Sequence, residues 1–163
     1  MSKPANPEEF ALVVLGVVML LPMWFGGREA NRVSSDLEGL HPAFRVPLER
    51  ALARLTAQGI AYHVQETVRS EQRARALRLR GTGIVRSLHR LGLAADVLPA
   101  RNSWTAGSDP FWAALRDAVE AEGLTSGASF SRVDRPHVQL FPASRDREMW
   151  ALYSAGTLDT VLA

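Results

Sequence analysis

Two short segments gather residue types that bind a catalytic metal. The first is SLHRLGLAAD at positions 87–96 and the second is DRPH at positions 134–137. A catalytic zinc ion takes three protein ligands and keeps one position open for water, and two imidazoles with one carboxylate leave the site net positive. His89, Asp96 and His137 can supply this set. Singly, each has an ordinary structural interpretation, but their joint spacing predicts a zinc (Zn²⁺) site.

Three further side chains have types that suit hydrolysis at such a site. Asp134 lies three residues before His137, where a carboxylate can reach metal-bound water without binding the metal, and it fits a general base. Arg69 is expected to face the cleft and to stabilise the charge that develops on a scissile carbonyl oxygen. Ser87 has two interpretations, because its hydroxyl can orient a substrate or bond the backbone of its own loop.

The elements that would position these residues alternate between helices and strands. Pro47 is expected in the first turn of a helix that Gly59 ends, and a strand with Arg69 on its cleft side follows. Ser70 can cap a short helix, and Asp109 with Pro110 can begin another. The segment RPHVQLF reads as a strand, and residues 144–153 as a last helix. This order predicts an α+β domain with a small, mostly antiparallel sheet flanked by helices.

Composition narrows the possible classes of protein. The chain has 163 residues, 47% of them hydrophobic, with no cysteine and a formal charge of +2. This length suits one domain, and the lack of thiolates means that any metal must be held by histidines and carboxylates. The basic stretch between Tyr62 and Trp104 has no aromatic residue for stacking on bases, so we expect no nucleic-acid partner.

Residues 10–27 form an uncharged, strongly apolar run near the N-terminus. As a helix at about 1.5 Å per residue, the run would extend roughly 27 Å, slightly less than a hydrocarbon core of about 30 Å. A cleaved signal peptide, a retained anchor and a buried helix are the alternatives. The lack of a small-residue cleavage site favours a retained signal anchor, a hydrophobic helix over 1–27, although the flanking charges mildly oppose export of the C-terminal part. We expect a polar linker over 28–40 and one globular domain with the predicted zinc site over 41–163, taken as a monomer.

The motif residues resemble those of a known family. The pattern S-x-H-x-x-G-x-A-x-D, followed by D-x-P-H, is similar to the zinc peptidases of peptidoglycan over roughly residues 40 to 141. It is preceded by R-S-E-Q, which resembles the family's R-S-x-x-Q element with a shorter spacing. That family contains D-alanyl-D-alanine carboxypeptidases and phage L-alanyl-D-glutamate endopeptidases, and the hedgehog signalling domain is a structural relative. The resemblance implies zinc bound by His89, Asp96 and His137. It also implies Asp134 as the base, and Arg69 with Gln72 as substrate contacts.

The resemblance also implies a function. An aspartate base in D-x-P-H is typical of the phage endopeptidases, so we expect cleavage of peptidoglycan stem peptides between L-Ala and D-Glu. The expected setting is a phage endolysin of the signal-arrest-release type. Residues 10–27 would anchor it to the inner membrane, with the catalytic domain facing the periplasm or released into it. The alternatives are a bacterial D-alanyl-D-alanine carboxypeptidase and a non-catalytic, zinc-stabilised cell-wall-binding module.

Overall fold

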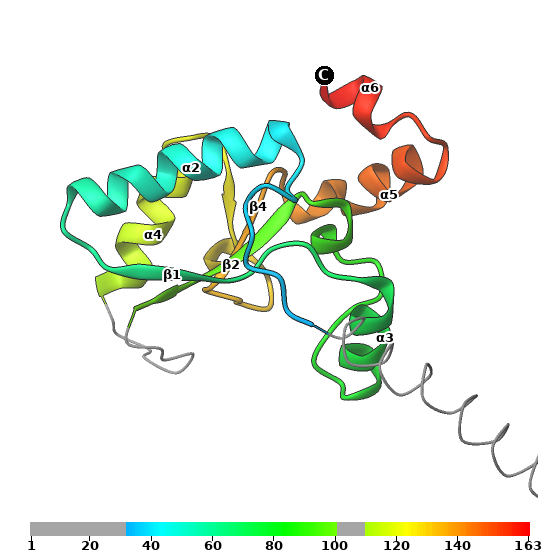
Figure 1. The fold of residues 1–163 in the computed structure, drawn as a ribbon, viewed down its shortest axis with the longest axis horizontal. Helices are drawn as coiled ribbons and strands as arrows, with labels where there is room; N and C mark the ends of the chain where they lie inside the picture. Colours follow the sequence, from blue (N-terminus) through cyan, green and yellow to red (C-terminus); the bar gives the residue numbers. More distant parts are fainter. Residues whose placement is uncertain (1–31, 101–109) are drawn as a thin grey trace, which may run out of the picture. The chain divides into compact units, whose positions relative to one another are not determined.

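The computed structural model describes residues 32–100 and 110–163, and residues 33–163 form one unit (Figure 1). The N-terminal hydrophobic helix and Asp109 lie outside the described residues. Within the described part, the elements in chain order are α2 (Pro42–Ala57), β1 (Tyr62–Glu66), α3 (Glu71–Leu79), η1 (Leu88–Leu91), β2 (Ala94–Pro99), α4 (Pro110–Glu120), β3 (Thr125–Ser126), η2 (Gly127–Ser129), β4 (His137–Gln139), η3 (Ala143–Arg145), α5 (Asp146–Ser154) and α6 (Leu158–Leu162).

The strands form one antiparallel sheet in the order β1-β2-β4-β3. The predicted α+β class and the antiparallel sheet are therefore confirmed. Helices α2 and α4 pack side by side against the sheet (Figure 1). The core between these layers is fully apolar at its centre, with Phe44, Leu48 and Leu115 no more than 1% exposed. Within the described residues, no helix is both long and apolar enough to span a membrane.

Helix α2 begins earlier than the sequence predicted. Its first residue is Pro42, and His41 is the N-cap, with its Nδ1 accepting a hydrogen bond of 3.1 Å from the Ala43 amide. Pro47 therefore lies inside the helix, where it lacks an N–H to donate. The extra turn brings Phe44 into line with Leu48 on the buried face, and burial of its ring offsets the missing hydrogen bond.

Strand β1 is shorter than predicted and irregular. It ends at Glu66, so Arg69 lies in the segment after it, where the Arg69 amide donates to the His89 carbonyl at 3.1 Å. The register shifts between Val64, opposite Val97, and Glu66, opposite Asp96. Two residues of β1 here span one step of β2, which is the geometry of a β-bulge. The bulge turns Glu66 toward the same side of the sheet as Asp96.

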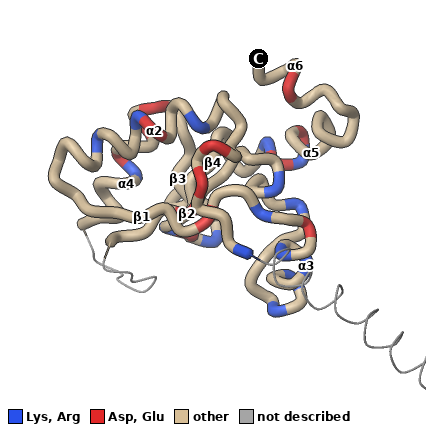
Figure 2. Tube along the Cα trace, in the orientation of Figure 1, with Lys and Arg blue, Asp and Glu red and all other residues tan. Residues whose placement is uncertain are grey.

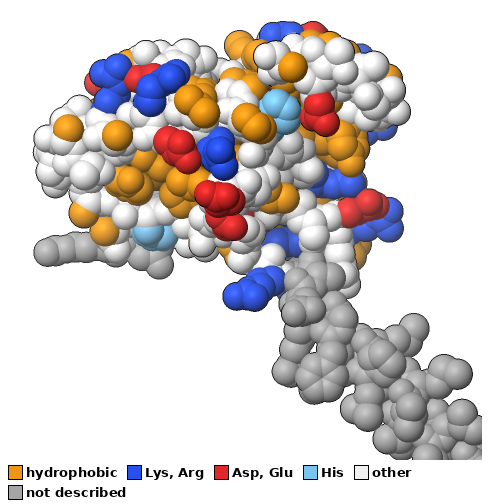
Figure 3. All heavy atoms as spheres, turned by 45° about the horizontal axis from the view of Figure 1, so that its top comes forward, with side chains coloured by type: hydrophobic (Ala, Val, Ile, Leu, Met, Phe, Trp, Pro, Cys, Tyr) orange, Lys and Arg blue, Asp and Glu red, His pale blue; other side chains and the backbone are white. Residues whose placement is uncertain are grey.

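The predicted start of the next helix is confirmed. The Ser70 hydroxyl accepts a hydrogen bond of 3.2 Å from the Arg73 amide at the start of α3. The first residues of the unit are also bonded to the domain, because the Ser34 carbonyl accepts from the amide and the hydroxyl of Thr67 at 2.6 and 3.1 Å. On the face shown in Figure 3, basic and acidic side chains are interspersed with hydrophobic ones.

Candidate metal centre

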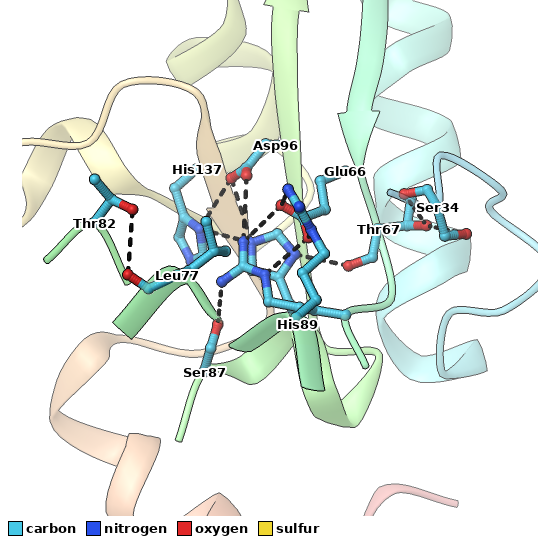
Figure 4. Close-up of polar contacts among 11 residues, drawn as sticks. Ser34, Glu66, Thr67, Leu77, Thr82, Ser87, His89, Asp96 and His137 are labelled. Carbon is cyan, nitrogen blue, oxygen red and sulfur yellow. Dashed lines mark hydrogen bonds and ion pairs between the residues drawn. The ribbon is translucent and has the colours of Figure 1, made fainter. Parts of the chain in front are cut away.

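Three side chains from three separate elements converge at one end of the sheet (Figure 4). His89 comes from η1, Asp96 from β2 and His137 from β4, where Asp96 and His137 are direct partners across the two strands. His89 Nε2, His137 Nδ1 and Asp96 Oδ1 lie 3.3 Å from one another. Ligand atoms about 2.0–2.1 Å from a tetrahedral zinc ion are about 3.3–3.4 Å apart, so the spacing fits zinc.

Both imidazoles are oriented by a hydrogen bond from the nitrogen that points away from Asp96. His89 Nδ1 donates to the Thr67 carbonyl at 2.7 Å, and His137 Nε2 donates to Gln139 Oε1 at 2.9 Å. The Gln139 amide nitrogen in turn donates to the Phe141 carbonyl at 2.6 Å, which fixes Oε1 as the acceptor. Such bonds fix the tautomer that leaves the other nitrogen available to a metal.

The charge state of Asp96 also suits a cation. Burial alone would raise the pKa of its carboxyl, but the neighbouring imidazoles of His89 and His137 hold that pKa far below its usual range. Asp96 is therefore an anion between two imidazole nitrogens. The donor set and its spacing together fit a zinc ion that would be held by His89, Asp96 and His137.

Gly92 ends the turn that carries His89. Its φ of +67° is in the left-handed region, and an added Cβ would lie 2.9 Å from the His41 backbone nitrogen. Only glycine therefore fits the step from η1 into β2 without displacing the start of α2. This explains, in physical terms, the glycine three residues after His89 in the motif.

Asp134 is held next to the ligands by the loop between η2 and β4. Its amide donates to the Gly127 carbonyl at 2.9 Å, and its own carbonyl accepts from the His137 amide at 3.0 Å. A Cβ on Gly127 would lie 2.2 Å from the Asp134 carbonyl oxygen, so this close approach requires glycine. The side chain is exposed at the rim of the cavity, where partial loss of water and the negative charge of Asp96 raise the pKa of the Asp134 carboxyl.

Arg69 lies beside the ligands in a cluster that the sequence did not predict. Its Nε and Nη2 donate to the two oxygens of Glu66, both at 2.8 Å, and its Nη2 lies 3.9 Å from Asp96 Oδ2. Arg73 contacts the same carboxylate, with its Nε 2.7 Å from Oε1 and its Nη2 3.3 Å from Oε2. Burial raises the pKa of Glu66, but hydrogen bonds from both arginines outweigh this effect and lower it.

Glu66 reaches the site only because of the β-bulge, although the sequence contained one observation that pointed to it. In a regular strand, Glu66 would share a face with Val64, which packs against the core, and would not reach the site. A glutamate with arginines three and seven positions later was the observation that could have predicted an ion cluster at the end of the strand.

A cavity of about 690 Å³ joins most of these residues. Six of the seven residues predicted from the sequence line it: Arg69, Ser87, His89, Asp96, Asp134 and His137. The Ser87 hydroxyl accepts a hydrogen bond of 3.4 Å from Arg69 Nη1. Gln72 is exposed on α3 and is not among the lining residues. One position later on the helix, about 100° further round, Arg73 faces the cavity in its place.

Comparison with solved structures places this fold among peptidoglycan peptidases. The L-Ala D-Glu endopeptidase ChiX of Serratia marcescens is 27% identical, with a TM-score of 0.55, over 64% of this chain and 83% of ChiX. The LD-carboxypeptidase LdcB is 14% identical, with a TM-score of 0.53, over 74% of this chain and 67% of LdcB. No family model and no curated protein sequence matches the chain. The resemblance to peptidoglycan peptidases is thus confirmed.

Proposed function

We propose that this chain is a zinc peptidase that cleaves peptidoglycan stem peptides between L-Ala and D-Glu. The observation that carries the proposal is the triangle of ligand atoms 3.3 Å apart, which shares one cavity with Asp134 and Arg69. The similarity to ChiX, an L-Ala D-Glu endopeptidase, supports the choice of bond. The aspartate in D-x-P-H supports the same choice.

The roles of the side chains follow from their positions. A zinc ion, when bound, would polarise the scissile carbonyl and lower the pKa of a water molecule. Asp134, at the rim of the same cavity, accepts a proton from the attacking water and returns it to the leaving amine. A raised carboxyl pKa makes Asp134 a stronger base and so favours the first of these transfers. Arg69 stabilises the negative charge that develops on the carbonyl oxygen, and Ser87 helps to hold its guanidinium.

Mass spectrometry of digested peptidoglycan tests this proposal. The full chain, loaded with zinc, is incubated with purified Gram-negative peptidoglycan, with and without a chelator, beside the variants His89→Ala and Asp134→Ala. We expect new D-Glu amino termini that the chelator and both variants abolish, while Asp134→Ala retains zinc. Loss of terminal D-Ala alone would instead identify a D-alanyl-D-alanine carboxypeptidase. A folded, zinc-loaded chain that cleaves nothing would indicate a binding module.

We further propose that the protein acts as a phage endolysin anchored to the inner membrane through residues 10–27. The apolar run supports an anchor, and its glycines suit a helix that can leave the membrane. Fractionation of cells before and after depolarisation tests this setting. A protein of unreduced mass that moves from the membrane to the periplasm supports release of the intact anchor. A shortened soluble form would instead indicate cleavage of a signal peptide.

A further inference from the structure

Arg73 is a cavity residue to which the proposed mechanism gives no role. Its side chain is 18% exposed and lines the cavity beside Glu66 and Arg69. Arg78 and Arg132 line the same cavity but are exposed, where water screens their charge. Figure 2 shows that basic residues gather on α3 and the segment that follows it. Among these cavity arginines, Arg69 and Arg73 are the two held in fixed positions by a buried carboxylate.

The ion cluster leaves positive charge at the cavity wall. Glu66 accepts four hydrogen bonds, two from each guanidinium, so both of its oxygens are fully used. Glu66 supplies one negative charge to two guanidiniums, and the other carboxylate near them, Asp96, lies 3.9 Å from Arg69 and belongs to the candidate metal site. With Asp96 assigned to the metal, one positive charge is not neutralised by Glu66. Within the described residues, Arg73 Nη1 has no hydrogen-bond partner. Guanidinium groups of this kind bind a carboxylate with strong, directional hydrogen bonds.

The cluster extends outward from the metal ligands in a fixed order. Arg69 lies between Asp96 and Glu66, and Arg73 contacts Glu66. If a peptide carbonyl lies against the candidate metal ligands and Arg69, Arg73 is therefore the next cationic side chain along the cavity, separated from Arg69 by Glu66. The group that Arg73 meets is then a neighbour of the scissile bond on the substrate.

The chemistry of the stem peptide supplies a matching group. In the proposed substrate, D-Glu continues the chain through its γ-carboxyl group, so its α-carboxylate is free. That carboxylate sits on the carbon that also carries the scissile nitrogen. We propose that Arg73 is a specificity-determining residue that binds the free α-carboxylate adjacent to the scissile amide. This inference rests on the proposed function, and it names the part of the substrate that the cavity selects.

A pair of substrates that differ in one group tests the assignment. The tripeptide L-Ala-γ-D-Glu-Lys is compared with its α-carboxamide, in which the charge is removed and the size is kept. For the full chain we expect kcat/KM to favour the carboxylate by about ten- to a hundredfold, as for hydrogen bonds to charged groups. Arg73→Gln should remove most of this preference by raising KM for the carboxylate, with little change for the carboxamide.

Arg75→Gln is the matched control. Arg75 lies on the same helix, is exposed outside the cavity and pairs with Glu71, so its loss should leave the preference unchanged. Arg73→Lys adds a test of geometry, because lysine keeps the positive charge but lacks the planar guanidinium with its paired N–H donors. This variant should retain only part of the preference for the carboxylate. An Arg73→Gln variant with the full preference of the native chain would overturn the assignment.

A binding measurement separates this inference from the proposed function. Calorimetry of the full chain with γ-D-Glu-Lys and with its α-carboxamide needs no turnover. If no tripeptide is cleaved but the carboxylate binds more tightly, and Arg73→Gln abolishes that difference, the subsite stands while the peptidase proposal fails. If cleavage occurs and neither measurement distinguishes the two ligands, the peptidase stands and the subsite is refuted.

Discussion

Glu66 is the residue on which the charged wall of the cavity depends. Replacing it by Gln removes the one carboxylate between two guanidiniums, and we expect a loss of about 3 kcal/mol in the free energy of unfolding at pH 7. Because the pKa of Glu66 in the folded chain is lower than its usual 4.5, this contribution is present above pH 4.5. It is lost as the pH falls through the folded value. Urea unfolding of both proteins across a pH series measures the difference.

Glu49→Gln is the control for this change. Glu49 is half exposed, and its pair with Arg45 at 3.8 Å on α2 is worth no more than about 0.5 kcal/mol. The interpretation of Glu66 would be contradicted if the two variants lost equal stability, or if the loss at Glu66 were unchanged in acid.

Gln139 acts on the candidate metal site indirectly, by orienting the His137 ring. With Gln139→Ala, the His137 ring loses the acceptor that holds its Nδ1 toward Asp96. We expect zinc affinity to fall by about ten- to a hundredfold, as for other partners of ligand histidines. Competition with a chelating dye measures this affinity, and Gln72→Ala, an exposed glutamine outside the cavity, should leave it unchanged. Equal affinities for the two variants would show that His137 is oriented by its ring packing alone.

At the scale of residues, the residue types and spacing of the motif were sufficient to predict which of its side chains lie close together. His89, Asp96 and His137 lie close together, and their types and spacing are those that predict a three-ligand metal site. Glu66 could not be predicted by the same reasoning. Strand periodicity assigns side chains to faces by alternation, and a bulge reverses that assignment without any change in residue type.

At the scale of elements, the loop from η2 to β4 depends on one close contact. Gly127→Ala places a methyl group where the Asp134 carbonyl oxygen lies, so the loop must move and carry His137 with it. We expect both zinc content and turnover to fall at least about tenfold, since a shift of about 1 Å at a catalytic group has effects of that size or larger. Metal analysis and assay of the purified variant measure the two losses.

Gly156→Ala distinguishes this contact from simple backbone strain. Gly156 has a φ of +70° and open space around its Cβ position, so alanine there costs about 1–2 kcal/mol without touching the site. Zinc content should be unaffected in that variant. Normal zinc content and turnover in Gly127→Ala would mean that the loop can adapt.

Helix and strand boundaries were predicted less well than the elements themselves. Proline at position 47 was expected in the first turn because that is where proline is tolerated, but the apolar face extends back to Phe44 and tertiary packing decides the start. The cap at Ser70 was predicted correctly, because a capping side chain acts on amides within three residues. Local chemistry was therefore a better guide than periodicity.

At the scale of the molecule, the three candidate metal ligands come from parts of the chain that are far apart in sequence. A zinc ion that binds the folded chain alone stabilises it by about 2.7 kcal/mol when free zinc is a hundred times its Kd. We expect a chelator to lower the melting temperature, and zinc to restore it. Calorimetry of the native chain and of His89→Ala tests this effect, and a zinc-dependent shift that persists in His89→Ala would place the ion elsewhere.

The class of fold followed from the order of elements, but the order of strands in the sheet did not. Strand β4 lies between β2 and β3, and this insertion makes Asp96 and His137 neighbours. Hydrophobic patterning specifies which face of a strand is buried, but it does not specify which other strand pairs with it. The metal motif was the one sequence observation that required these two strands to lie close together.

The contact between Thr67 and Ser34 sets where a working domain must begin. Thr67 is fully buried, its amide and hydroxyl donate to the Ser34 carbonyl, and its own carbonyl orients His89. A chain shortened past Asp36 would leave these two donors without acceptors, and a buried unpaired donor costs about 1–3 kcal/mol. The N-terminal limit of the domain is thus fixed by the support of His89, several residues before α2 begins.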